Sequence, residues 1–86
     1  MPEISRFFGI IIAMYWDEHE PPHFHAKYNE YEALIDIKEG IIIQGMLPSK
    51  QARLVLAWLE IHKEELLNNW ESILAGKGYS KIAPLS

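Results

Sequence analysis

The C-terminal third of the chain shows one long run of helical periodicity, which decides most of what the chain can fold into. Across residues 49–75, apolar side chains recur every three or four positions on one broad stripe, namely Ala52, Val55, Leu56, Leu59, Leu66, Leu67, Trp70, Ile73 and Leu74. Gly76 and Gly78 then end the helix and leave a tail at residues 76–86. A helix of this length would extend about 40 Å, so we expect it to kink or break near His62-Lys63.

The preceding residues read as four short strands that can cover this stripe. Residues 6–17 are almost uninterruptedly apolar, residues 23–28 and 31–37 alternate, and residues 41–47 follow a turn at Gly40. The sequence therefore predicts a single α+β domain over residues 1–86, a four-stranded, mainly antiparallel sheet packed by one long C-terminal helix. Because the first strand is apolar on both faces, we expect a second subunit to cover the face that the helix leaves open, which predicts a homodimer.

The central hairpin has a predicted register. Asn29-Glu30 lies between two tyrosines and fits a two-residue loop. That loop pairs Tyr28 with Tyr31, Lys27 with Glu32, His25 with Leu34 and His23 with Asp36. Phe24 and Ala26 would then point into the core, and the two histidines to the other side.

Three of the four histidines lie in one segment, His19-Glu20-Pro21-Pro22-His23-Phe24-His25. Its two prolines hold the backbone extended, and His23 and His25 would project from one face of a strand about 7 Å apart. Together with His19 they offer ligands for a zinc- or nickel-like divalent metal. The prolines exclude the helical H-E-x-x-H motif, and no other established metal-binding spacing matches. The alternative is histidines that are partly exposed and hydrogen-bonded to the backbone or to acidic neighbours.

The same segment suggests acid–base chemistry. Asp36 opposite His23 would orient the imidazole, and His62 would be a second titrating group, so His23, Asp36 and His62 are the candidate catalytic residues of a small metal- or histidine-dependent hydrolase or nuclease. No serine lies in a G-x-S-x-G motif. The competing interpretation is a cross-strand pair that only stabilises the sheet.

A second apolar patch lies on the first half of the predicted helix. Leu54, Trp58 and Ile61 fall outside the main stripe. They form either a partner-binding surface or a part of the helix that is buried more deeply in the core.

Composition excludes several classes of protein. There is no cysteine, so disulfides and thiolate metal sites are ruled out. The net charge is −4 and the eight Lys and Arg residues are scattered, which disfavours nucleic acid as a ligand, including an autoregulatory DNA-binding role. No apolar run approaches the roughly 20 residues that span a bilayer, and no leader is recognisable, so we expect a cytoplasmic protein that does not bind membranes.

The chain also resembles a bacterial family, the "domain of unknown function 4160". The resemblance rests on Pro2-x-Ile4-Ser5-x-Phe7-x-Gly9-Ile10, Met14-Tyr15, Pro21-Pro22-His23-Phe24-His25-Ala26, Tyr31-Glu32-Ala33, Ile35-Asp36-Ile37, Gly45-x-Leu47-Pro48, Trp58-x-x-x-His62-x-x-Glu65-Leu66 and Asn69-Trp70. It implies no settled activity. Members are often encoded beside a small protein of the "domain of unknown function 2442" type, an arrangement like a two-gene toxin–antitoxin pair. The resemblance therefore implies an interaction module with a small cognate protein, and the hydrolase or nuclease is the alternative.

Overall fold

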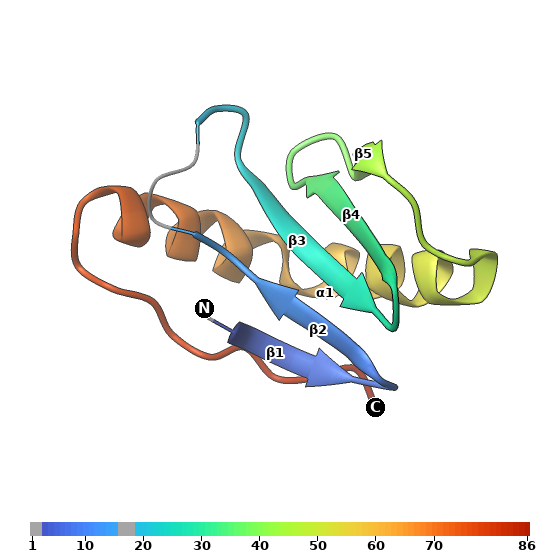
Figure 1. Cartoon of the computed structure of the whole chain (residues 1–86). Coiled ribbons are helices and arrows are strands. Elements are labelled where there is room, and N and C mark those ends of the chain that lie inside the picture. Colours follow the sequence, from blue (N-terminus) through green and yellow to red (C-terminus); the bar gives the residue numbers. More distant parts are fainter. Residues whose placement is uncertain (1–2, 16–18) are drawn as a thin grey trace.

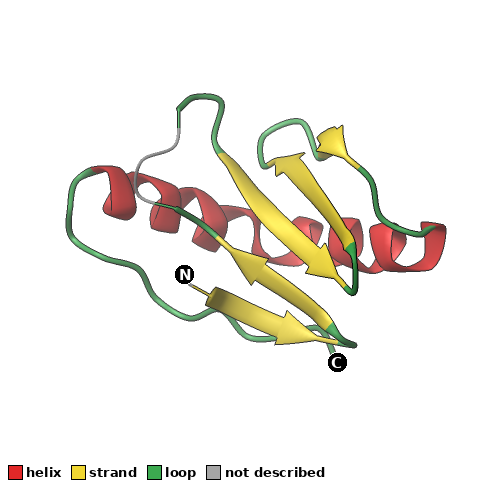
Figure 2. Cartoon of the chain, viewed as in Figure 1, coloured by secondary structure: helices red, strands yellow, loops and turns green. Residues whose placement is uncertain are grey.

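The structure, a computed structural model, describes residues 3–15 and 19–86. Its elements are β1 (Glu3–Phe7), β2 (Ile10–Ala13), β3 (His23–Tyr28), β4 (Tyr31–Asp36), β5 (Ile41–Gly45) and α1 (Ser49–Leu74). The strands form one antiparallel sheet in the order β1-β2-β3-β4-β5. Figure 1 shows α1 crossing one face of this sheet, and Figure 2 shows the same two layers by secondary structure. The fold is α+β with one C-terminal helix, as predicted, but the sheet has five strands rather than four.

The additional strand comes from a turn at Phe8-Gly9. The predicted strand 6–17 is instead a hairpin, in which Phe7 pairs with Ile10. Phe8 and Gly9 have φ values of 50° and 77°, and a type I′ turn requires positive φ at both of its central residues. Glycine adopts this conformation without strain. Phe8 is not a typical turn residue, and because it lies in an apolar run the sequence did not predict a turn here. The predicted end of the strand, Trp16-Asp17, lies outside the described residues.

The register of the β3–β4 hairpin is as predicted. His23 is opposite Asp36, His25 opposite Leu34, and Tyr28 opposite Tyr31. Asn29 adopts a φ of 52°, which its short polar side chain tolerates better than most residues do. The two-residue loop therefore decides which side chains of β3 point toward α1.

The core lies between the sheet and α1. Ile12, Phe24 and Ile35 are fully buried, and the ring of Trp58 packs against Phe24 with ring centroids 5.8 Å apart. The predicted break in the helix is confirmed, because His62 has non-helical angles of φ −113° and ψ 21°. In the described part of the chain, no helix is long and apolar enough to cross a membrane.

The two edges of the sheet differ. Residues 76–86, called the tail below, return beside β1 (Figure 1), where the amide of Ile82 donates a 2.8 Å hydrogen bond to the carbonyl of Ile4. At the other edge, the backbone hydrogen bonds found among residues 3–15 and 19–86 join β5 to β4 alone. One edge of the sheet is accompanied by the chain's own tail, and the other is exposed.

Candidate functional site

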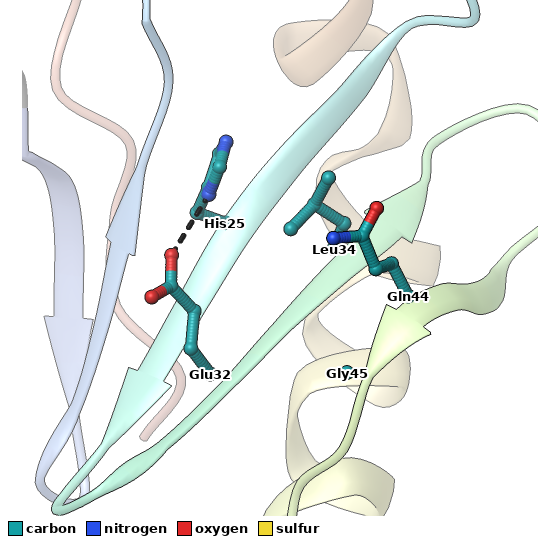
Figure 3. Close-up of a pocket in the computed structure, with 5 residues that line it drawn as sticks. All are labelled: His25, Glu32, Leu34, Gln44 and Gly45. Carbon is teal, nitrogen blue, oxygen red and sulfur yellow. Dashed lines mark hydrogen bonds and ion pairs between the residues drawn. The ribbon is translucent and has the colours of Figure 1, made fainter.

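The sheet face that points away from α1, called the open face below, carries the histidine segment. Strand pairing places Ala13, His25, Leu34 and Gln44 in one row across this face. The row borders a hollow of about 460 Å³, which is lined by His25, Glu32, Leu34, Gln44 and Gly45 (Figure 3). Three adjacent strands therefore contribute to one recess.

His25 is held in a fixed orientation at the hollow. Its Nδ1 donates a 3.0 Å hydrogen bond to Oε2 of Glu32, drawn as a dashed line in Figure 3. The ring also meets the ring of Tyr15 edge-on, with centroids 4.6 Å apart. Because the carboxylate can only accept, Nδ1 carries the proton, and in the neutral imidazole Nε2 carries a lone pair.

His23 lies beside His25 and is buried. Its Nδ1 donates a 2.8 Å hydrogen bond to the carbonyl of Pro21, so this imidazole has the same tautomer. The ring centroid lies 5.7 Å from that of His25 and 5.1 Å from that of Trp70. Trp70 in turn donates from Nε1 to Oε2 of Glu20 at 2.9 Å. A series of ring contacts thus joins the open face to the second half of α1.

The three predicted catalytic residues do not form one constellation. Asp36 is opposite His23 in the sheet, but its Oδ1 accepts a 2.9 Å hydrogen bond from the amide of Glu39 and so fixes the turn after β4. His62 lies at the kink of α1, where its ring packs on Trp58 and its Nδ1 donates to Glu65 at 2.6 Å. Within the described residues, no hydrogen bond or ring contact links any two of these three side chains.

The predicted metal ligands are brought together only in part. His23 and His25 are neighbours, whereas His19 is exposed on the loop before β3. Among residues 3–15 and 19–86, no group of three or more His, Asp or Glu side chains could hold a metal ion. A zinc- or nickel-like metal at His19, His23 and His25 stays a prediction.

The second apolar patch, Leu54, Trp58 and Ile61, is buried at one residue and exposed at another. Trp58 is 0% exposed, Leu54 is half-buried, and only Ile61 is exposed, at 66%. The tail covers this side of the helix, and Trp58 Nε1 donates a 2.9 Å hydrogen bond to the carbonyl of Ala83. For Trp58 the structure agrees with the alternative of deeper burial in the core, because the sheet and the tail both contact this side chain. Partner binding at Leu54, Trp58 and Ile61 stays a prediction.

Sequence reasoning missed the exposed apolar side chains at β5. Ile41, Ile43 and Met46 are 53%, 42% and 60% exposed. A signal was present, because antiparallel strands that pair in sequence order leave the last strand at an edge of the sheet. The apolar run at residues 41–43 predicts a strand, but it does not show which of its side chains are exposed.

Two side chains of β1, Glu3 and Arg6, have shifted pKa values. This strand is separated from β3 and the hollow by β2. Arg6 donates hydrogen bonds to both carboxylate oxygens of Glu3, at 2.8 and 3.2 Å. This contact lowers the pKa of Glu3 and raises the pKa of Arg6. Both side chains are at the surface, so the pair contributes little to stability.

Comparison with protein families matches residues 9–71 to one described as a domain of unknown function (DUF4160). The matched range contains the histidine segment, the hollow and the kink in α1. No curated protein and no solved structure matches the chain.

Proposed function

The chain belongs to the family described as a domain of unknown function (DUF4160), and on that premise we propose that it is an interaction module that binds a small cognate protein through the open face of its sheet. The partner is a second small protein of a two-gene, toxin–antitoxin-like pair, as the family resemblance suggests. The setting for this pair is the bacterial cytoplasm.

One observation carries the proposal, the hollow on the face that α1 does not cover. Its lining combines an aliphatic side chain, Leu34, with polar groups from His25, Glu32 and Gln44. Protein interfaces combine an apolar centre with a few placed polar groups in this way. A side chain of the partner would insert here.

The polar groups of the hollow are already in position before a partner arrives. The hydrogen bond between His25 and Glu32 holds both side chains, so little side-chain entropy is lost on binding. Gln44 offers both a donor and an acceptor. These groups would select the polar contacts of the partner, while Leu34 supplies apolar contact.

The test distinguishes two possible binding sites for the partner, the open face and the α1 surface that the sequence predicted. Leu34→Lys places a charge in the hollow, and Ile61→Lys makes the same kind of change on exposed α1. We expect Leu34→Lys to abolish co-purification with the neighbouring "domain of unknown function 2442" protein when the two are co-expressed, and Ile61→Lys to retain it. Circular dichroism establishes that both variants fold. Retention by Leu34→Lys together with loss by Ile61→Lys would move the interface to α1 and refute the proposal.

A hydrolase or nuclease is the second candidate, and the tautomers of His23 and His25 favour it. Metal-binding histidines commonly donate one ring nitrogen to a carbonyl or a carboxylate and bind the ion through the other. Both imidazoles here make such a bond, to Pro21 and to Glu32. Elemental analysis of protein purified without chelator or histidine tag distinguishes the candidates. One equivalent of zinc or nickel, lost in His25→Gln, would favour the enzyme.

A further inference from the structure

The edge of the sheet at β5 is exposed, and we consider which molecule binds there. We propose that a second copy of this chain pairs at β5, strand against strand in antiparallel orientation, so that two five-stranded sheets become one continuous sheet. The resulting homodimer is symmetric about a two-fold axis between the two β5 strands. This interface goes beyond the proposed function and does not depend on it.

The first argument is the exposed apolar surface at this edge. Seven large apolar side chains are exposed in the described part of the chain, and Ile41, Ile43 and Met46 are three of them. An edge strand also presents unpaired amide and carbonyl groups that can bond to another strand. Apolar contact and backbone hydrogen bonds would therefore act together at β5, as in strand addition.

The second argument explains why assembly stops at two copies. The tail accompanies β1 through the bond between Ile82 and Ile4, and the buried side chain of Ile82 packs there. In the described part of the chain, β5 is therefore the edge strand that no other segment accompanies. Pairing β5 with β5 uses both exposed edges and leaves none for further growth, which gives a closed dimer rather than a fibre.

The third argument identifies the occupant as a second copy. The strand β5 reads Ile-Ile-Ile-Gln-Gly and carries no charge, so a two-fold pairing brings no like charges together. A charged foreign strand would find no opposite charge on β5, whereas the same strand from a second copy supplies matching apolar side chains. Ile43 is the residue that the bulge between Ile42 and Gln44 leaves without a partner on β4, and its side chain is 42% exposed.

The geometry has a consequence for the open face. Strands that pair edge to edge keep both helices on one side of the continuous sheet, so both open faces lie on the other side. Gln44 and Gly45 line the hollow and also belong to β5. The dimer would thus present two hollows on one surface, separated by the two β5 strands.

The experiment is sedimentation velocity over a range of protein concentrations. Because β5 is only five residues long, we expect a reversible dimer whose population rises with concentration. Ile43→Lys should raise the dissociation constant about tenfold or more, because two lysines would meet across the two-fold axis. Ile61→Lys, the matched change at an exposed isoleucine on α1, should dimerise like the wild type.

Several outcomes would refute this interface and leave the proposed function standing. These are a wild-type chain that stays monomeric at every concentration, an Ile43→Lys variant that dimerises like the wild type, or a dimer lost in Ile61→Lys. If Ile43→Lys does not fold, as judged by circular dichroism, Ile41→Lys tests the same edge. Leu34→Lys should keep the dimer and lose the cognate protein, so failure of one interface is distinguishable from failure of the other.

Discussion

At Gly45 the backbone of β5 leaves no room for a side chain beside β4. Its φ is +76°, and a Cβ atom there would lie 2.1 Å from the carbonyl oxygen of Glu32 and 3.1 Å from the Cα of Ala33. The next amide, that of Met46, donates a 3.2 Å hydrogen bond to the same carbonyl. Both the backbone conformation and the lack of a side chain are therefore required at this position.

Gly45→Ala should accordingly destabilise the protein more than an ordinary glycine substitution. We expect a loss of at least about 2 kcal/mol in the free energy of unfolding, from the left-handed conformation plus displacement of backbone atoms that have no room to move. Gly76→Ala is the matched control, because Gly76 has a φ of +75° and no atom within 4 Å of the added Cβ. Urea unfolding measures both. Equal losses would show that only the conformation matters and that the close approach does not.

Residue identity predicted the backbone at the site better than it predicted the side-chain bonds. The pairing of His23 with Asp36 followed from the loop Asn29-Glu30. The bond made by Asp36 did not follow, because a carboxylate near a turn can satisfy either a neighbouring imidazole or a backbone amide, and here it accepts from Glu39. A register restricts which atoms can meet, and local geometry then selects among them.

At the scale of elements, the side chain of Asn69 holds the tail in place with two hydrogen bonds to the backbone of Ser80. The amide group of Asn69 donates to the carbonyl of Ser80 at 2.7 Å and accepts from the amide of Ser80 at 2.9 Å. Asn69 is buried on α1. This reciprocal pair fixes the tail where it leaves the helix, before Ile82 reaches β1.

Asn69→Ala should therefore release the tail. We expect a loss of about 1–3 kcal/mol, because the substitution leaves backbone groups of Ser80 without their partners. The amide of Ile82 should exchange with deuterium faster, because the tail would separate from β1 more often. Asn68→Ala is the control, since this neighbouring asparagine is exposed and should change stability by less than about 0.5 kcal/mol. Unchanged exchange at Ile82 in Asn69→Ala would contradict this role.

The elements also show why the sequence left open whether Trp58 is buried or exposed. A helical projection identifies one apolar stripe and does not decide whether apolar residues outside that stripe are buried or exposed. Here the sheet covers one side of the first half of α1 and the tail covers another, so Trp58 contacts the ring of Phe7 and also bonds to Ala83. An irregular tail has no periodicity from which its path could be predicted. The kink at His62, in contrast, was predictable from length alone.

At the scale of the whole molecule, the accessible surface area of one copy is close to that expected of a folded monomer of its mass. Its accessible surface is 5084 Å², and a monomer of 10.0 kDa is expected to have about 5,200 Å². Its core forms without a partner, since Phe24 of the sheet, Trp58 of α1 and Ile82 of the tail are all buried within one chain. The proposed dimer therefore adds an interface to a folded monomer and is not needed to form the core.

Because the core forms within one copy and the dimer interface is additional, dilution should change the stability of the wild type but should not unfold the monomer. If each copy folds alone, Ile43→Lys should unfold cooperatively in urea, with a midpoint that does not change with protein concentration. Wild type should show a midpoint that rises with concentration, because dimerisation stabilises the folded state by mass action. The buried Trp58 and Trp70 provide a fluorescence signal for the transition. An Ile43→Lys variant that is unfolded at every concentration, while Ile61→Lys is folded, would instead show that β5 pairing is part of the fold.

If the urea midpoint rises with concentration in the wild type and Ile61→Lys but not in Ile43→Lys, the dimer interface lies at the β5 edge and each copy forms its core alone.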